Sequence, residues 1–263
     1  MSSDSTKKTI FVALGVCFVC SVLVSTTAVS LNSIQKNNQK REKLKNILAA
    51  GDLLQKETTI EKTYQTNIDP VVIDIGSGKL LREDGVPPDL NIQNFDLKDV
   101  SKDPRLSETI PPDEDIANIK RRPKYMVVYR VMEGDSVSKY ILPIYGKGLW
   151  STMYGFIALD DDLRTIRGFT FYDHGETPGL GGEVDNPKWK QTWEGKMAFD
   201  QNRQLRIQVL KGSVDPSDPN SKFKVDGLSG STLTTRGVDQ LVRYWLGENG
   251  YGPFFDYLRE EKS

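Results

Sequence analysis

An uncharged apolar segment near the start of the chain is its strongest pattern. Residues 9–31 have the sequence TIFVALGVCFVCSVLVSTTAVSL, without Asp, Glu, Lys or Arg. A helix needs roughly 20 such residues to cross the hydrocarbon core of a membrane. The apolar part of a cleavable signal peptide is usually shorter, about 7–15 residues. We therefore predict a transmembrane helix over residues 9–31 that is retained as an anchor.

The next segment, residues 32–124, alternates between helical and irregular patterns. Leu44, Ile47 and Leu48 have helical spacing within a charged stretch, which predicts a juxtamembrane helix. We expect it to be a solvated stalk that packs lightly on the domain. Residues 84–124 are rich in proline and acidic side chains, which is typical of a long irregular surface segment.

From residue 125 onward, β-branched and aromatic runs alternate with turn residues. The runs are YMVVYRV, SKYILPIY, STMYGFIALD and TIRGFTFY, and they predict a meander of antiparallel strands. A short helix is expected in NPKWKQTWEGK, with Trp189 and Trp193 four residues apart on one face. LRIQVLKG predicts another strand.

The last strong pattern is an amphipathic helix that closes at Gly247. Its apolar positions follow the i, i+3, i+4, i+7 spacing of a helix packed on one face: Val238, Leu241, Val242, Trp245 and Leu246. We therefore predict an α+β fold for residues 125–263, with an antiparallel sheet and flanking helices.

Composition excludes several classes of function. The net charge is −1, so there is no broad basic field for nucleic acid. The lone histidine, His174, cannot form a multi-histidine metal site. Cys17 and Cys20 lie inside the apolar run, where cysteine usually behaves as a small hydrophobic residue. The chain also has no G-x-G-x-x-G fingerprint for a dinucleotide.

A loop rich in hydroxyl groups precedes the final helix. Residues 225–238 have the sequence VDGLSGSTLTTRGV, and Thr234 or Thr235 is the predicted N-cap. Unpaired N–H groups at a helix start suit a phosphate or another anion. The residues alone leave a plain helix cap, a nucleophilic serine and a hydroxyl joined to a phosphate group open. The serine is disfavoured because Ser231 replaces the last glycine of G-x-S-x-G and the histidine lies upstream.

The stretch DGLSGSTLTT resembles the flavinylation motif of the FMN-binding domain family, whose usual core is Ser-Gly-Ala-Thr with an earlier aspartate. In that family a flavin transferase moves FMN from FAD onto the threonine as a phosphoester. The resemblance implies Thr232 as the acceptor. It also implies that Asp226, Ser229 and Gly230 are recognition residues.

One position departs from this motif, since Ser231 stands where the family has alanine. Ser231 therefore places a second hydroxyl beside the acceptor, and Thr234 is the next candidate acceptor.

The resemblance extends beyond the loop. The anchor, DHGETPGLGGEVDNPKW and YWLGENGYGPF together resemble the family of C subunits of sodium-translocating NADH:quinone oxidoreductases. This implies a membrane flavoprotein with covalent FMN, which transfers electrons in a complex that oxidises NADH, reduces ubiquinone and exports Na+. The implied partners are the other subunits, a flavin transferase and membrane lipid. An Rnf-type G subunit and an anchored binding module without a redox cofactor are the alternatives.

The block at residues 173–185 is predicted to face the flavin, because its proline and glycines form a shaped loop rather than a helix or strand. Glu176 and Thr177 are expected to hydrogen-bond ribityl or ring atoms, and Leu180 is expected to pack on the ring. The alternative is an ordinary tight turn.

Three further residues complete the predicted site. Lys211 would place a cation near the ring or the phosphate, with a solvated lysine as the alternative. Trp150 and Ser151 would line the site through stacking and a hydroxyl contact. A core position is the alternative for Trp150.

The charges around the anchor disagree with the resemblance about orientation. Two lysines precede the anchor and five basic residues follow it before residue 46, so the positive-inside rule alone places the C-terminal domain in the cytoplasm. The resemblance implies a single-pass protein of the bacterial inner membrane, with residues 1–8 cytoplasmic and the domain periplasmic. We follow the resemblance, because the rule weakens when a large domain follows the span.

Overall fold

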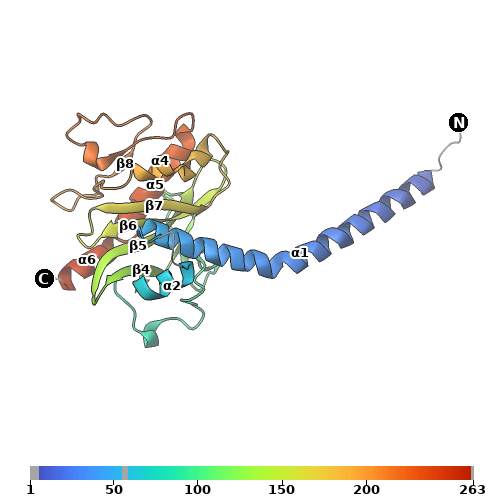
Figure 1. Cartoon of the computed structure of the whole chain (residues 1–263), viewed down its shortest axis with the longest axis horizontal. Helices are drawn as coiled ribbons and strands as arrows, with labels where there is room; N and C mark the ends of the chain where they lie inside the picture. Colours follow the sequence, from blue (N-terminus) through green and yellow to red (C-terminus); the bar gives the residue numbers. More distant parts are fainter. Residues whose placement is uncertain (1–5, 55–58, 262–263) are drawn as a thin grey trace. The chain divides into compact units, whose positions relative to one another are not determined.

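The computed structural model describes residues 6–54 and 59–261, so most of the predicted cytoplasmic segment 1–8 lies outside the described residues. The chain divides into two compact units, with the boundary in the sequence between Glu42 and Lys43. The first consists of most of helix α1 (Thr6–Ala50), whose apolar segment is exposed and is long enough to cross a membrane (Figure 1). The predicted anchor and the predicted juxtamembrane helix are therefore parts of one continuous helix.

The last turns of α1 belong to the second unit and are packed into its core. Ile47 and Leu48 are almost fully buried, so the prediction of a lightly packed stalk is wrong. Lys139 donates a hydrogen bond from Nζ to the carbonyl oxygen of Gly51 at 2.9 Å, which fixes the end of the helix. Asn46 and Ala50 are buried as well, so the domain encloses the end of the helix on more than one side.

A five-stranded antiparallel sheet forms the centre of the second unit, with the order β1-β4-β5-β6-β7 (Figure 1). The last four strands follow one another in sequence, which confirms the predicted meander. β1 lies at the edge and comes from the segment predicted to be helical or irregular. The strands are β1 (Ile68–Asp74), β4 (Tyr125–Glu133), β5 (Ser136–Lys147), β6 (Thr152–Asp160) and β7 (Ile166–Asp173).

Helix α5 (Thr232–Leu246) packs against β5, and α6 (Gly252–Glu261) follows it. All five apolar positions predicted for α5 are buried, and Gly247 caps the helix as predicted. Trp245 donates from Nε1 to the carbonyl oxygen of Tyr145 on β5 at 2.7 Å. α5 is therefore fixed to the sheet by apolar packing and a buried hydrogen bond.

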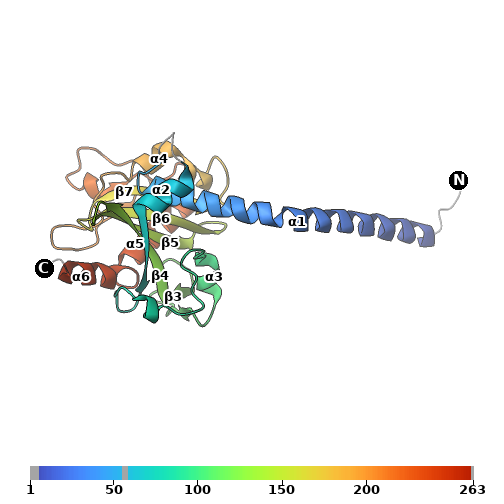
Figure 2. The same cartoon turned by 60° about the horizontal axis from the view of Figure 1, so that its bottom comes forward.

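The remaining elements are short. The predicted tryptophan helix shortens to α4, so Trp193 lies in the turn after the helix and not on its face. Its ring still contacts that of Trp189, at 5.8 Å between centroids. The predicted strand in LRIQVLKG shrinks to β8, which pairs with β9. In the lower part of Figure 2, α3 and β3 lie together within the long irregular segment. These elements are α2 (Ile60–Asn67), η1 (Glu83–Gly85), α3 (Leu97–Lys102), β2 (Ser107–Thr109), β3 (Arg121–Pro123), η2 (Gly181–Asp185), α4 (Pro187–Gln191), β8 (Gln208–Val209), η3 (Ser221–Phe223) and β9 (Lys224–Val225).

The close approach of α5 to the end of β5 depends on Gly237. A Cβ at this position would lie 2.4 Å from the carbonyl oxygen of Lys147. Alanine is normally better than glycine within a helix by about 1 kcal/mol. Here we expect the Gly237→Ala variant to lose about 1–3 kcal/mol of unfolding free energy, because overpacking forces the backbone apart. Denaturant unfolding monitored by tryptophan fluorescence measures the change.

Gly212→Ala is the matched control, since a Cβ at Gly212 would have no neighbour within 4 Å. Its unfolding free energy should stay within about 0.5 kcal/mol of the parent. A Gly237→Ala variant more stable than the parent would contradict the proposed packing.

Candidate functional site

Three loops meet at the N-terminal end of α5, and we call them the site loops. They comprise residues 148–151, 174–182 and 226–231. Two glycines allow the close approach. A Cβ at Gly148 would lie 2.6 Å from Oε1 of Glu176, and a Cβ at Gly181 would lie 2.5 Å from Oγ1 of Thr234. A larger side chain at either position would therefore displace the side chain of Glu176 or Thr234.

The carboxylate of Glu176 joins the site loops. Its Oε1 accepts hydrogen bonds from the backbone N–H groups of Trp150 at 3.0 Å and Ser151 at 3.1 Å. Its Oε2 accepts from the N–H of Leu149 at 3.1 Å and from the hydroxyl of Thr234 at 2.7 Å. Glu176 is only 5% exposed. One buried side chain thus connects the first loop to helix α5.

These bonds determine the charge of Glu176. Burial raises the pKa of its carboxyl, but the hydrogen bonds from Thr234 and from the three backbone N–H groups bring that pKa below the usual value of 4.5. Glu176 is therefore ionised at neutral pH. Its oxygens are occupied by groups of this chain, and the predicted contact with ribityl or ring atoms stays a prediction.

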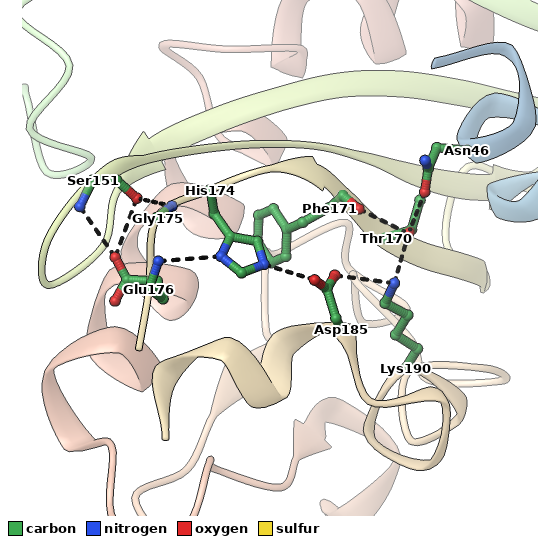
Figure 3. Close-up of polar contacts among 9 residues, drawn as sticks. All are labelled: Asn46, Ser151, Thr170, Phe171, His174, Gly175, Glu176, Asp185 and Lys190. Carbon is green, nitrogen blue, oxygen red and sulfur yellow. Dashed lines mark hydrogen bonds and ion pairs between the residues drawn. The ribbon is translucent and has the colours of Figure 1, made fainter. Parts of the chain in front are cut away.

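Ser151 extends the same connection. Its hydroxyl accepts from the N–H of Gly175 at 2.7 Å and lies 3.3 Å from Oε1 of Glu176 (Figure 3). The neighbouring Thr177 has an exposed side chain, and its carbonyl oxygen accepts from the N–H groups of Leu180 and Gly182. The predicted shaped loop therefore contains a hydrogen-bonded turn.

Helix α5 begins earlier than predicted. Its first residue is Thr232 and its N-cap is Ser231, so the prediction of Thr234 or Thr235 as N-cap is wrong. Gly230, with φ of +71°, turns the chain immediately before the helix. The Thr234 hydroxyl donates to Glu176, whereas that of Thr235 accepts from the N–H of Leu228 at 3.0 Å. Both hydroxyls therefore serve tertiary contacts inside the first turn.

Thr232 differs from its hydroxyl neighbours in exposure. Its side chain faces solvent, whereas Ser231 is buried and Thr234 is fully buried. The Ser231 hydroxyl lies 3.1 Å from that of Thr234. Since an acceptor must be reached by an enzyme, this geometry favours Thr232 over Thr234. The free N–H groups of the helix start lie in the same turn.

Exposed apolar side chains lie on the site loops and the first turn of α5. Trp150 is 66% exposed, so the alternative of a core position for it is wrong. Leu180 lies against Gly230, where a Cβ would be 3.4 Å from Cδ2 of the leucine. The set consists of Leu149, Trp150, Leu180 and Leu233. A flat aromatic ligand attached near Thr232 would find apolar surface of this kind.

Asp226 is the first residue of the third site loop, and the backbone of Lys211 lies beside that loop. Oδ1 of Asp226 accepts from the N–H of Val214 at 2.6 Å, so this carboxylate braces the loop before the motif. A Cβ at Gly227 would lie 2.9 Å from the carbonyl carbon of Lys211, which places that backbone beside the motif. The side chain of Lys211 is exposed, and its role near a flavin stays a prediction. Ser229 is exposed beside Gly230.

The domain that contains these loops and the start of α5 belongs to the FMN-binding class. The model of the FMN-binding domain family matches residues 148–247, a range that contains all three site loops. More specifically, the chain belongs to the family formed by the C subunits of Na(+)-translocating NADH-quinone reductases. It is 44% identical to that subunit from Yersinia pestis over 263 residues, covering 98% of this chain and 95% of the relative. Identity to the Pseudomonas aeruginosa protein is 45% over 265 residues, covering 100% and 99%.

Solved structures agree with this assignment. The crystal structure of Shewanella oneidensis NqrC superposes with a TM-score of 0.76 at 33% identity, covering 85% of this chain and 99% of that one. The corresponding reductase subunit from Parabacteroides distasonis gives a TM-score of 0.62 at 25% identity, with 87% and 96% covered. The resemblance inferred from the sequence is therefore confirmed, and the relatives favour this family over the Rnf-type alternative.

Proposed function

We propose that this chain carries one FMN in a phosphoester bond to Thr232 and transfers electrons within a membrane complex that oxidises NADH, reduces ubiquinone and exports Na+. The observation that supports this most directly is the exposed Thr232 at the start of α5, beside two buried hydroxyls in a flavinylation-like motif. The assignment to this complex rests on the relatives, which are C subunits of Na(+)-translocating NADH-quinone reductases.

The residues present fit such a group. When bound, FMN would supply the redox chemistry through its isoalloxazine ring. The phosphodiester would keep one negative charge, which the N–H groups and dipole at the start of α5 stabilise. Trp150 and Leu180 offer apolar surface to the ring, and Glu176 keeps the loop that carries Trp150 in place. A covalent tether also retains the cofactor through repeated turnover.

Several steps belong to partners rather than to this chain. NADH binding falls to another subunit, because the sequence lacks a dinucleotide fingerprint. The span at residues 9–31 has no Asp, Glu, Lys, Arg or His for a sodium path, so we place this path elsewhere in the complex. A flavin transferase attaches the FMN, and lipid surrounds the anchor.

Intact mass tests the covalent FMN. The full chain, made in a host with a flavin transferase, should be heavier than the bare chain by one esterified FMN. Its band should fluoresce on a denaturing gel. Chain from the same host without the transferase should be dark and unmodified. A dark band with the transferase present would support the alternative of an anchored module without a cofactor.

We further propose that the domain after the anchor is periplasmic. A reporter that is active only in the periplasm, fused after residue 263, should be active in cells. The same fusion to a reporter active only in the cytoplasm should be silent although the protein is present. The reverse pair of results would mean that the basic residues after the anchor determine the orientation.

A further inference from the structure

His174 is the only histidine of the chain and directly follows β7, two residues before Glu176. Its side chain is 12% exposed, and its ring lies edge-on to that of Phe171. Figure 3 shows both ring nitrogens engaged. Nε2 lies 2.8 Å from Oδ2 of Asp185, and Nδ1 lies 3.2 Å from the backbone nitrogen of Glu176.

These two partners determine the tautomer of the ring. A backbone N–H can only donate, so Nδ1 must offer its lone pair to Glu176, and Nε2 must carry the proton donated to Asp185. A second proton on His174 would turn Nδ1 into a donor that faces another donor. The contact with Asp185 would then become an ion pair. Protonation thus breaks the hydrogen bond from the Glu176 N–H to Nδ1 and strengthens the contact between Nε2 and Asp185.

Asp185 is itself fixed from the other side. Nζ of Lys190 lies 3.4 Å from Oδ1 of Asp185 and 3.0 Å from the hydroxyl of Thr170. That hydroxyl donates to Oδ1 of Asn46 in the last turns of α1 at 3.0 Å. This chain of contacts, drawn in Figure 3, restrains Asp185. When the ring becomes charged, the contact that changes is therefore the one between Nδ1 and the backbone N–H of Glu176.

The charged groups around the ring are mostly acidic. Asp185 faces it from η2, Asp173 and Glu176 flank it in sequence, and Lys190 reaches it only through Asp185. The hydrogen bond with Asp185 raises the pKa of His174 above its ordinary value of 6.5, against the opposing effect of partial burial. The ring therefore gains its second proton at a higher pH than an ordinary histidine does.

We propose that His174 is a positioning residue of the flavin site: neutral Nδ1 holds the backbone of Glu176, and a proton taken up there releases it and loosens the loop 148–151. The inference rests on the proposed flavin site, since that site is what His174 positions. A shift of the Glu176 backbone reaches this loop because three N–H groups of the loop are bonded to the Glu176 carboxylate.

A first experiment needs no flavin. The full chain in detergent, without a polyhistidine tag and labelled with 15N on histidine and glutamate, gives ring signals from one histidine alone. At pH 8.5 these signals should report a proton on Nε2. On lowering the pH, ring protonation and the shift of the Glu176 amide should share one midpoint. A proton on Nδ1 at high pH would overturn the proposal. So would a Glu176 amide whose chemical shift does not change as the ring is protonated. Both outcomes count whether or not the chain carries FMN.

A second experiment uses the flavin-carrying chain and two complementary variants. His174→Asn keeps an acceptor near Nδ1 but does not titrate. Its flavin absorption and fluorescence should match the high-pH form of the parent between pH 5.5 and 8.5. His174→Gln reaches toward Asp185 but leaves Glu176 without an acceptor. It should match the low-pH form throughout. Identical behaviour of the two variants, or a His174→Asn variant that titrates like the parent, contradicts the positioning role.

Asp185→Asn separates the charge from the geometry. The amide still accepts from Nε2, but it no longer favours the charged ring. The transition should therefore keep its direction and move to lower pH by about one unit. An unchanged midpoint would mean that another group is titrating.

Discussion

The Thr232→Val variant is expected to carry no covalent flavin. Valine has nearly the shape of threonine and removes only the hydroxyl that forms the phosphoester. Position 232 is the exposed first residue of α5, where valine meets no buried partner. The domain should therefore fold with its unfolding free energy changed by no more than about 0.5 kcal/mol. Intact mass and flavin fluorescence on a denaturing gel measure the loss of FMN against the parent.

Three further variants make this result specific. Thr232→Ser keeps a hydroxyl at the acceptor position and should retain part of the flavin. Ser231→Ala restores the residue usual in the family and should retain all of it. Thr234→Val should keep the covalent FMN while losing its hydrogen bond to Glu176. A flavin that persists in Thr232→Val and disappears in Ser231→Ala or Thr234→Val would move the acceptor to the neighbouring hydroxyl.

Patterns local to the sequence predicted most of the fold. The four strands of the meander stand out as β-branched and aromatic runs, and helix α5 stands out by its helical period, so local composition and spacing are enough to predict them. β1 was missed because Pro70 and two aspartates interrupt its apolar run. Proline is tolerated there because β1 is an edge strand. An edge position depends on the whole sheet, and the local sequence does not contain it.

The candidate site was only partly predictable for the same reason. The hydroxyl loop and the glycine-rich block stand out in the sequence, and the structure brings them together. The role of Glu176 depends on partners 25 to 58 residues away, so no spacing rule reveals it. The N-cap was misplaced because Thr234 and Thr235 look like caps, whereas tertiary contacts use their hydroxyls. The prediction of a flavin rests on the resemblance to a family, because no periodic pattern in the sequence indicates a cofactor.

Glu176→Ala should dismantle the site loops while leaving the sheet in place. It removes a buried carboxylate and leaves the Thr234 hydroxyl and three backbone N–H groups without their acceptor. We expect the unfolding free energy to fall by about 2–4 kcal/mol, less than the full sum because the exposed loop can be hydrated. Amide exchange at residues 149–151 should accelerate by about tenfold or more. Glu194→Ala, at an exposed position, is the control and should change neither quantity.

The pH dependence distinguishes this electrostatic role from simple packing. Because the pKa of Glu176 is lower in the folded chain than its usual value of 4.5, its stabilising effect is present above that value. It is lost as the pH falls through the folded-state pKa. The stability difference between the parent and Glu176→Ala should therefore be largest near neutral pH and shrink in acid. A difference that does not shrink as the pH falls well below 4.5 would mean that the side chain acts through its volume, and that ionised oxygens do not hold the loops together.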